Sequence, residues 1–130
     1  MSTHRHKSRE CALQIMYQVD AGTEAGQAIP DFFAHFALSG DGIDFATELV
    51  KGAVAHLPEL DEKIKTHSAK WRIDRMDVVD RNVLRLATYE LNYTPEVPPK
   101  VVLDEWIEVA KRYGTEHSAA FVNGILDSML

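Results

Sequence analysis

The sequence predicts an all-α fold of about seven helices in one domain. Apolar residues recur at spacings of three, four and seven along most of the chain, which is typical of amphipathic helices. No stretch alternates apolar and polar residues in the way that a half-buried strand does. The chain has 130 residues, of which 45% are hydrophobic and 26% charged, so it is long enough to bury one hydrophobic core.

The first predicted helix starts at Ser2 or Thr3, either of which can be its N-cap, and ends at Gly22. Cys11 lies in its apolar stripe and is expected to be a small core residue. Because Cys11 is the single cysteine, neither an internal disulfide nor a cysteine-based zinc site is expected. The other members of the stripe are Ala12, Ile15, Met16 and Val19.

The second predicted helix lies within residues 27–38, where Pro30 can be its first helical residue, and Ser39-Gly40 stops it. We expect its aromatic residues to form one core face, because they lie three or four positions apart. They are Phe32, Phe33 and Phe36.

The third predicted helix is capped by Asp41 or Asp44 and ends at Pro58, and the same proline opens the fourth helix. The third helix has a broad apolar stripe that includes Phe45, Leu49 and Ala53. The fourth helix is expected to bury Leu60, Ile64 and Trp71, which are spaced by four and seven.

The fifth predicted helix is the most apolar and is therefore expected at the centre of the bundle. Asp74 or Asp77 can cap it, and Thr94-Pro95 ends it, because the residue before proline is disfavoured in the α region. Its broad apolar stripe leaves four charged positions outside: Asp77, Asp80, Arg81 and Arg85.

The last two predicted helices run from Pro98-Pro99 to Tyr113-Gly114, and from a Thr115 cap to the end of the chain. Asn-Gly at 123–124 is a strong hairpin motif, but the residues on both sides of it follow the helical period. Gly124 is therefore interpreted as a point where another helix backbone passes close.

The chain is expected to form one domain, residues 1–130, because it contains no 20 to 50 residue repeat and no low-complexity linker. Two subdomains, 1–73 and 74–130, are a further possibility. No signal peptide or run of about 18 apolar residues is present, so we expect no membrane contact and a cytoplasmic location.

The net charge of −6 is distributed unevenly along the chain. Residues 1–9 contain Arg5, Lys7 and Arg9 and no acid, whereas residues 10–62 have ten acids and the single cation Lys51. Residues 63–85 form a second basic island of net charge +4. A local basic patch on an acidic protein indicates binding to a polyanion, and the alternative is a solvated N-terminus.

The first helix can combine cations with an aromatic ring. Arg5 and Arg9 lie four residues apart, and Tyr17 follows two turns after Arg9, so we expect all three on one side of the helix. Such an edge can pair phosphates and stack a base of single-stranded RNA. On the central helix, Asp77, Asp80 and Arg81 are candidates for a polar protein interface, with a solvated face as the alternative.

No catalytic or metal-binding constellation is found in the sequence. The six histidines form no i, i+4 pair and no H-E-x-x-H motif, and the seven glycines form no phosphate-binding loop. Carboxylate pairs such as Asp104 with Glu108 are helix neighbours and are typical of solvated faces. We therefore expect neither an enzyme nor a cofactor.

Three stretches of the chain resemble a known family. They are R-H-K-S-R-E-C-A-L-Q-I-M-Y near the start, D-R-N-V-L-R-L-A-T-Y-E-L in the middle, and V-P-P-K-V-V-L-D-E-W-I-E-V-A-K-R-Y-G-T-E-H-S-A-A-F-V-N-G-I-L-D near the end. They resemble the NusB family of bacterial transcription antitermination factors. The resemblance is strongest over residues 78–127 and weak over 22–58.

The resemblance implies two packed helical subdomains and a non-enzymatic role. Family members bind boxA RNA together with a ribosomal protein that acts as NusE, and they act with other Nus factors and RNA polymerase in ribosomal RNA operons. By position, Asp80 and its neighbours would face the ribosomal protein. The RNA side would use Arg5, His6, Lys7, Arg9, Tyr17 and Phe121.

The chain departs from the family pattern in its basic N-terminal segment, where His4 and His6 dilute the arginines, and at two further positions. His117 stands one helical turn before Phe121, where an acid is common, and the loss of that negative charge is expected to favour RNA binding. Trp106 stands where relatives often have a small residue, so it is either packed more deeply or exposed as an anchor for self-association.

Two alternatives to the antitermination role remain at this point. The chain can be a helical interaction protein that forms a homodimer without binding RNA. It can also be a relative of the NusB-like domain of ribosomal RNA methyltransferases, although it has no glycine-rich strand-turn-helix pattern for S-adenosylmethionine.

Overall fold

The computed structural model describes residues 2–69 and 71–130, and their elements confirm the all-α class. The side chains of Ser2, Thr3 and His4 lie outside the described part, and so does the expected cap at Ser2 or Thr3. The described elements are α1 (Ser2–Asp20), α2 (Ala25–Phe33), α3 (Gly40–Ala55), α4 (Leu57–Ser68), the 3-10 turn η1 (Ile73–Arg75), α5 (Val78–Tyr93), α6 (Pro99–Tyr113) and α7 (Ser118–Asp127).

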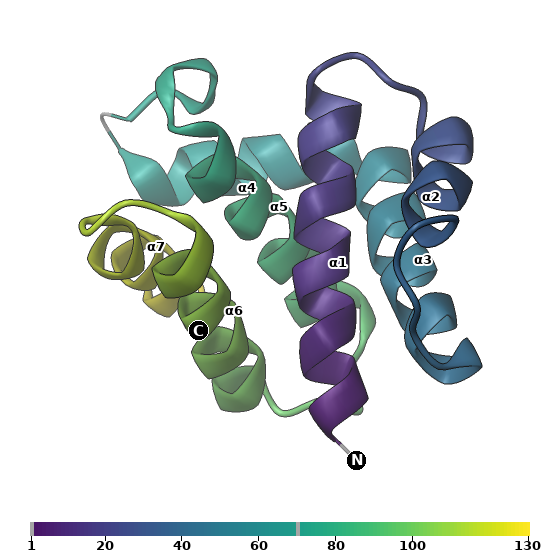
Figure 1. Ribbon diagram of the computed structural model, residues 1–130. Coiled ribbons are helices and arrows are strands. Elements are labelled where there is room, and N and C mark those ends of the chain that lie inside the picture. Colours follow the sequence, from purple (N-terminus) through teal and green to yellow (C-terminus); the bar gives the residue numbers. More distant parts are fainter. Residues whose placement is uncertain (1, 70) are drawn as a thin grey trace.

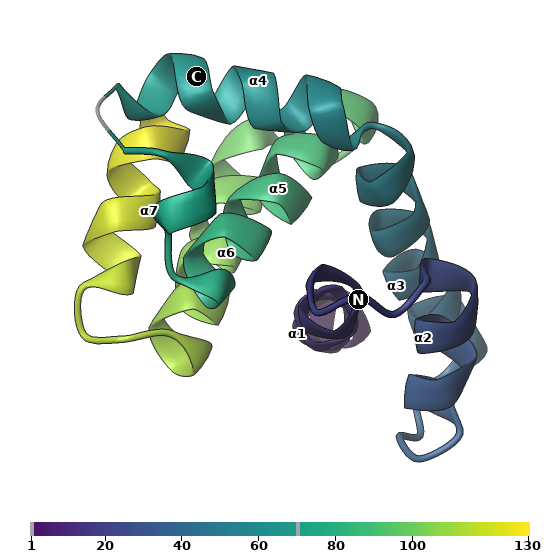
Figure 2. The same ribbon diagram turned by 90° about the horizontal axis from the view of Figure 1, so that it is seen from above.

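Helix α1 lies between two groups of helices (Figures 1 and 2). On one side it packs against α2 and α3, and on the other side against α5 and α6, with α7 beyond them. Helix α4 joins the two groups, because it follows α3 in the chain and packs against α5 and α7. The division at residue 73 stays a prediction, since α1 contacts both groups.

Helix α5 is the central helix, as predicted. Val83, Leu84, Leu86 and Ala87 are completely buried. Helix α3 approaches α5 closely because Gly52 has no side chain: a Cβ at this position would overlap the ring of Tyr89. Cys11 is buried as expected, and burial raises the pKa of its thiol to about 11.

Helix α2 differs from its prediction in both bounds. It covers Ala25–Phe33 rather than 27–38, and Pro30 lies inside it instead of at its start. Pro30 lacks a backbone donor, which costs one hydrogen bond but does not prevent the helix from starting earlier. The ring of Phe36 lies outside the helix and is exposed, so the expected aromatic core face is incomplete.

The predicted ends of α3 and α4 also need correction. Ser39 caps α3 by accepting a hydrogen bond from the Gly42 amide at 3.1 Å, in place of Asp41 or Asp44. Helix α4 begins at Leu57, one residue before Pro58, and ends at Ser68. Trp71 is therefore not part of the α4 core stripe.

The C-terminal helices follow the prediction more closely. Asp77 is the N-cap of α5 and accepts from the Val79 amide at 2.9 Å. Thr115 supports the start of α7 by accepting from the His117 amide at 3.2 Å, although His117 occupies the N-cap position. Gly124 is helical, but a Cβ there would meet nothing within 4 Å, so the predicted close approach of another helix is wrong.

Candidate nucleic-acid interface

Arg9 is a core residue and not part of an exposed basic edge. Its side chain is 2% exposed. The Arg9 Nε donates to Glu90 Oε1 at 2.9 Å, and its Nη2 donates to the second oxygen of the same carboxylate. The Trp106 indole also donates to Glu90 Oε1, at 2.8 Å. Trp106 is completely buried, so of its two predicted roles deeper packing is correct.

Helix geometry explains why Arg9 and Tyr17 face different directions. Eight residues at 100° each leave them about 80° apart around the axis, whereas the sequence prediction treated them as aligned. Tyr17 is 54% exposed. The prediction of one edge that carries Arg5, Arg9 and Tyr17 is therefore wrong, because Arg9 is buried and Tyr17 lies about 120° around the axis from Arg5.

His6 connects α1 to α6 through carboxylates. Its Nδ1 lies 3.0 Å from Glu105 Oε1, and its Nε2 lies 3.2 Å from Glu10 Oε2. Arg112 also contacts Glu10, at 3.3 Å. A protonated His6 would thus form ion pairs within the protein, and a phosphate would have to compete with Glu10 and Glu105 for it.

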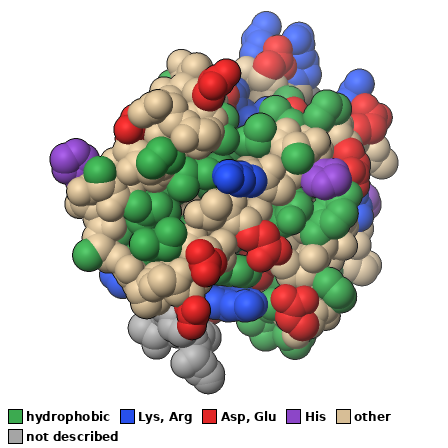
Figure 3. All heavy atoms as spheres, turned by 90° about the vertical axis from the view of Figure 1, so that its right-hand side faces the viewer, with side chains coloured by type: hydrophobic (Ala, Val, Ile, Leu, Met, Phe, Trp, Pro, Cys, Tyr) green, Lys and Arg blue, Asp and Glu red, His purple; other side chains and the backbone are tan. Residues whose placement is uncertain are grey.

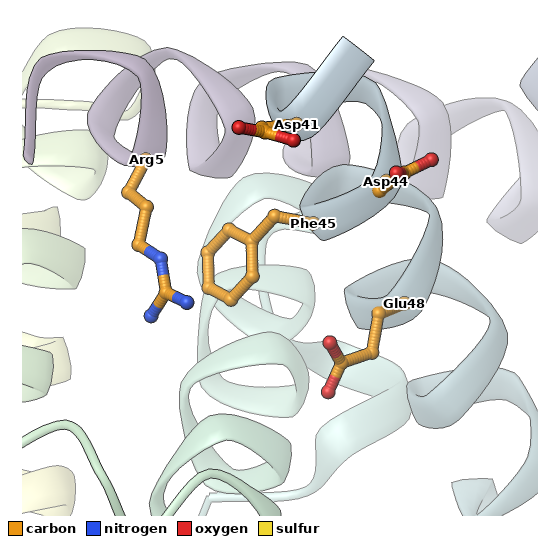
Figure 4. Close-up of a pocket in the computed structure, with 5 residues that line it drawn as sticks. All are labelled: Arg5, Asp41, Asp44, Phe45 and Glu48. Carbon is orange, nitrogen blue, oxygen red and sulfur yellow. The ribbon is translucent and has the colours of Figure 1, made fainter. Parts of the chain in front are cut away.

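Arg5 is half-buried against α3. Its guanidinium lies over the ring of Phe45, 4.3 Å from the centroid, which is the geometry of a cation–π interaction. Figure 4 shows Arg5 beside a hollow of about 330 Å³ that α3 lines with Phe45 and three carboxylates. These are Asp41, Asp44 and Glu48. Lys7, by contrast, is exposed.

Tyr17 lies far from the N-terminal cations. Twelve residues separate it from Arg5, which corresponds to about 18 Å along the helix. It shares a mainly apolar hollow of about 360 Å³ with Phe32, Val79 and Tyr113. A neighbouring hollow of about 320 Å³ connects Tyr17 to Asp77 and to Thr115, in the link between α6 and α7.

The two other predicted RNA residues follow this link: His117 is the N-cap residue of α7, and Phe121 lies in its first turn. His117 is 86% exposed and lies 3.4 Å from the carboxylate of Glu116. Phe121 is half-buried and packs edge-on against Trp71, with 5.5 Å between ring centroids. Sequence reasoning missed Trp71 as a surface residue because its spacing from Ile64 matched a core stripe.

The three residues predicted to face a protein partner differ in exposure. Asp77 is exposed, whereas Asp80 is buried and its Oδ1 has no hydrogen-bond partner in the described part of the chain. Burial raises the pKa of Asp80, as does the nearby charge of Asp77, while a hydrogen bond with Ser118 lowers it. Asp80 is therefore less accessible to a partner than Asp77.

Arg81 is engaged within the protein. It donates to both oxygens of Asp20, at 2.7 and 3.0 Å, and Asn82 donates to the same carboxylate at 2.8 Å. Burial alone would raise the pKa of Asp20, but these hydrogen bonds outweigh it, so the pKa is lowered. Arg85, expected outside the apolar stripe, is buried and forms a bidentate pair with Asp61.

The face formed by α2 and α3 carries side chains of mixed type. Figure 3 views the side formed by α2 and α3, where acidic, basic and hydrophobic side chains are interspersed. Among the described residues, no group of three or more His, Cys, Asp or Glu side chains could hold a metal ion. None of the described helices is long and apolar enough to span a membrane.

The fold and these surfaces define a small all-helical protein with charged and aromatic side chains on its surface. The sequence matches the NusB family over residues 6–130. Two relatives are both called transcription antitermination protein NusB. The one from Anaeromyxobacter dehalogenans (strain 2CP-1) is 47% identical over 99% of this chain and 92% of its own length. The one from Myxococcus xanthus is 44% identical over 95% and 91%.

Solved structures give the same result. NusB of T. maritima has a TM-score of 0.89 and 37% identity, and the match covers 99% of this chain and 92% of that chain. A structure described as antitermination factors NusB and NusE in complex with dsRNA has a TM-score of 0.91 and 30% identity, with 99% and 97% covered. The chain belongs to the NusB family.

Proposed function

We propose that this chain is a transcription antitermination factor that binds boxA-type single-stranded RNA together with the ribosomal protein acting as NusE. In this role it promotes read-through in ribosomal RNA operons, in the cytoplasm and without catalysing a reaction. The observation that carries the proposal is the similarity over nearly the whole chain to a NusB that was solved with NusE and RNA.

The exposure of the predicted residues supports an RNA role for some of them more than for others. Lys7, Tyr17 and His117 are exposed, and Phe121 is half-buried. Arg5 and His6 are partly exposed, but Arg5 already contacts Phe45 and His6 already contacts two carboxylates. Arg9 is better explained as a support for α1, because its charge is already neutralised by Glu90. Of the three residues proposed to contact the NusE-type protein, Asp77 is the exposed one.

A binding titration tests this proposal. Labelled boxA RNA and a scrambled RNA of the same composition are titrated with the protein, with and without the NusE-type ribosomal protein. We expect preference for boxA and a gain in affinity when the partner is present. Equal binding of both RNAs under both conditions would contradict the RNA role.

Sedimentation analysis across protein concentrations addresses the alternative of a homodimer that binds no RNA. A stable dimer together with the absence of boxA binding would favour that alternative. The methyltransferase relationship is not favoured, because the similar proteins named above are antitermination proteins of nearly the same length.

A further inference from the structure

Trp71 has an exposed indole ring and lies shortly after the end of α4. It lies between α4 and η1 and is 55% exposed, while Leu60 and Ile64 of the preceding helix are completely buried. The Ser68 hydroxyl donates to the Trp71 carbonyl oxygen at 2.9 Å. The next residue, Arg72, is held by Asp74 at 2.8 Å. The hydrogen bond from Ser68 holds the Trp71 carbonyl, and the ring is exposed to solvent.

Phe121 supports this indole from another helix. The two rings meet at 85° with 5.5 Å between centroids, which is a favourable edge-to-face arrangement. Figures 1 and 2 both place the segment that leads into η1 beside α7. A ring held by its own backbone and by a second ring loses little conformational freedom when a flat partner binds to it.

Two cations of the second basic island lie next to the indole. Trp71 lies within the second basic island, residues 63–85, and the exposed cations of that island include Lys65, Arg72 and Arg75. Lys65 and Arg72 line a hollow of about 310 Å³ next to the indole. Three carboxylates line the same hollow: Asp61 and Asp74 accept hydrogen bonds from Arg85 and Arg72, and Glu62 is exposed.

We propose that Trp71, backed by Phe121, stacks an unpaired base of the bound RNA, with Lys65 pairing a flanking phosphate. The inference rests on the proposed function and extends its RNA site from α7 to the turn after α4. A flat exposed ring among cations matches single-stranded RNA, which offers both base faces and phosphates. The island's positive charge favours this partner over an apolar protein surface.

The test compares three variants with the wild-type protein in the boxA titration. Trp71→Ala should weaken RNA binding by about 5- to 100-fold, the range expected when one stacked base is lost. Trp71→Phe keeps a stacking ring and should retain most of the affinity. Phe36→Ala removes a ring that is also exposed but follows α2, on the other side of α1 (Figure 1), and it should leave RNA binding unchanged.

Intrinsic fluorescence provides a second measurement. Trp106 is completely buried, so RNA that stacks on the protein should quench the emission of Trp71 alone. The quenching should be absent in Trp71→Phe even though this variant still binds RNA. The thermal unfolding of Trp71→Ala should match that of the wild type, since the ring lies outside the main core.

The outcomes separate this inference from the proposed function. If the wild type prefers boxA and Trp71→Ala binds it equally well, the stacking role is overturned and the function stands. If Trp71→Ala loses affinity for the NusE-type protein but not for RNA, the surface belongs to a protein partner and the inference is again overturned. If the wild type does not prefer boxA, both fail.

Discussion

At the scale of single residues, Arg9 belongs to the basic N-terminal segment, but its charge stabilises the core. Glu90 is completely buried and accepts hydrogen bonds from both Arg9 and Trp106. A buried carboxylate is tolerated when its oxygens are paired and hydrogen-bonded. The pair thereby fixes the position of α1 against α5 and α6.

Arg9→Met is therefore expected to destabilise the protein by about 3 to 5 kcal/mol, because it leaves Glu90 buried without its counter-charge. The free energy of unfolding, measured by chemical denaturation, checks this value. The double variant Arg9→Met with Glu90→Gln removes both charges and keeps an acceptor for Trp106. It should be more stable than Arg9→Met alone, and a wild-type stability of the single variant would contradict the role of the pair.

The sequence could identify charged and aromatic residues but could not assign their partners. Arg9 and Glu90 are 81 positions apart, and no local pattern links them. The same holds for Asp20 with Arg81. Trp106 left two interpretations open because its surroundings were unknown. Phe121 is placed at the surface beside Trp71, whereas its role in RNA binding stays a prediction.

At the scale of helices, two glycines in helix interiors have opposite surroundings. A Cβ on Gly52 would overlap the ring of Tyr89, whereas a Cβ on Gly124 would meet nothing within 4 Å. Glycine is disfavoured in helices relative to alanine by about 1 kcal/mol. Whether replacement by alanine helps or harms therefore depends on the space around each Cβ.

Gly124→Ala is expected to stabilise the protein by about 0.5 to 1 kcal/mol. Gly52→Ala should destabilise it by about 1 to 3 kcal/mol, because α3 and α5 must move apart. Thermal and chemical unfolding of both variants check the signs. A destabilising Gly124→Ala would indicate an unseen close contact at α7, and a stabilising Gly52→Ala would contradict the tight α3–α5 packing.

The helices with clear start and stop residues were predictable. Pro98-Pro99 and Tyr113-Gly114 mark the bounds of α6, which extends over Pro99–Tyr113. The bounds of α2 were less predictable. Pro30 suggested that the helix starts there, but tertiary packing overrides this local signal. Trp71 continued the period of α4, yet the chain leaves the helix at Ala69, which has a φ of 55°. Periodicity alone does not reveal such a turn.

At the scale of the whole molecule, α1 packs against both groups of helices. The RNA contacts proposed on α1 lie near its two ends. Arg5 and Lys7 lie near its start, while Tyr17 lies near its end, next to the link that leads to α7. Because the protein has a net charge of −6, RNA affinity must come from such local groups. Their number is measurable through the dependence of affinity on salt concentration.

Each phosphate contact on single-stranded RNA contributes about −0.7 to the slope of log affinity against log salt concentration. Lys7→Gln should therefore make the slope shallower by about 0.7, whereas Lys51→Gln, on α3, should leave it unchanged. Arg9 is buried on Glu90, so the folded fraction of Arg9→Met should keep the wild-type slope. A loss of about 0.7 in that variant would instead mean that Arg9 leaves Glu90 to contact a phosphate when RNA binds.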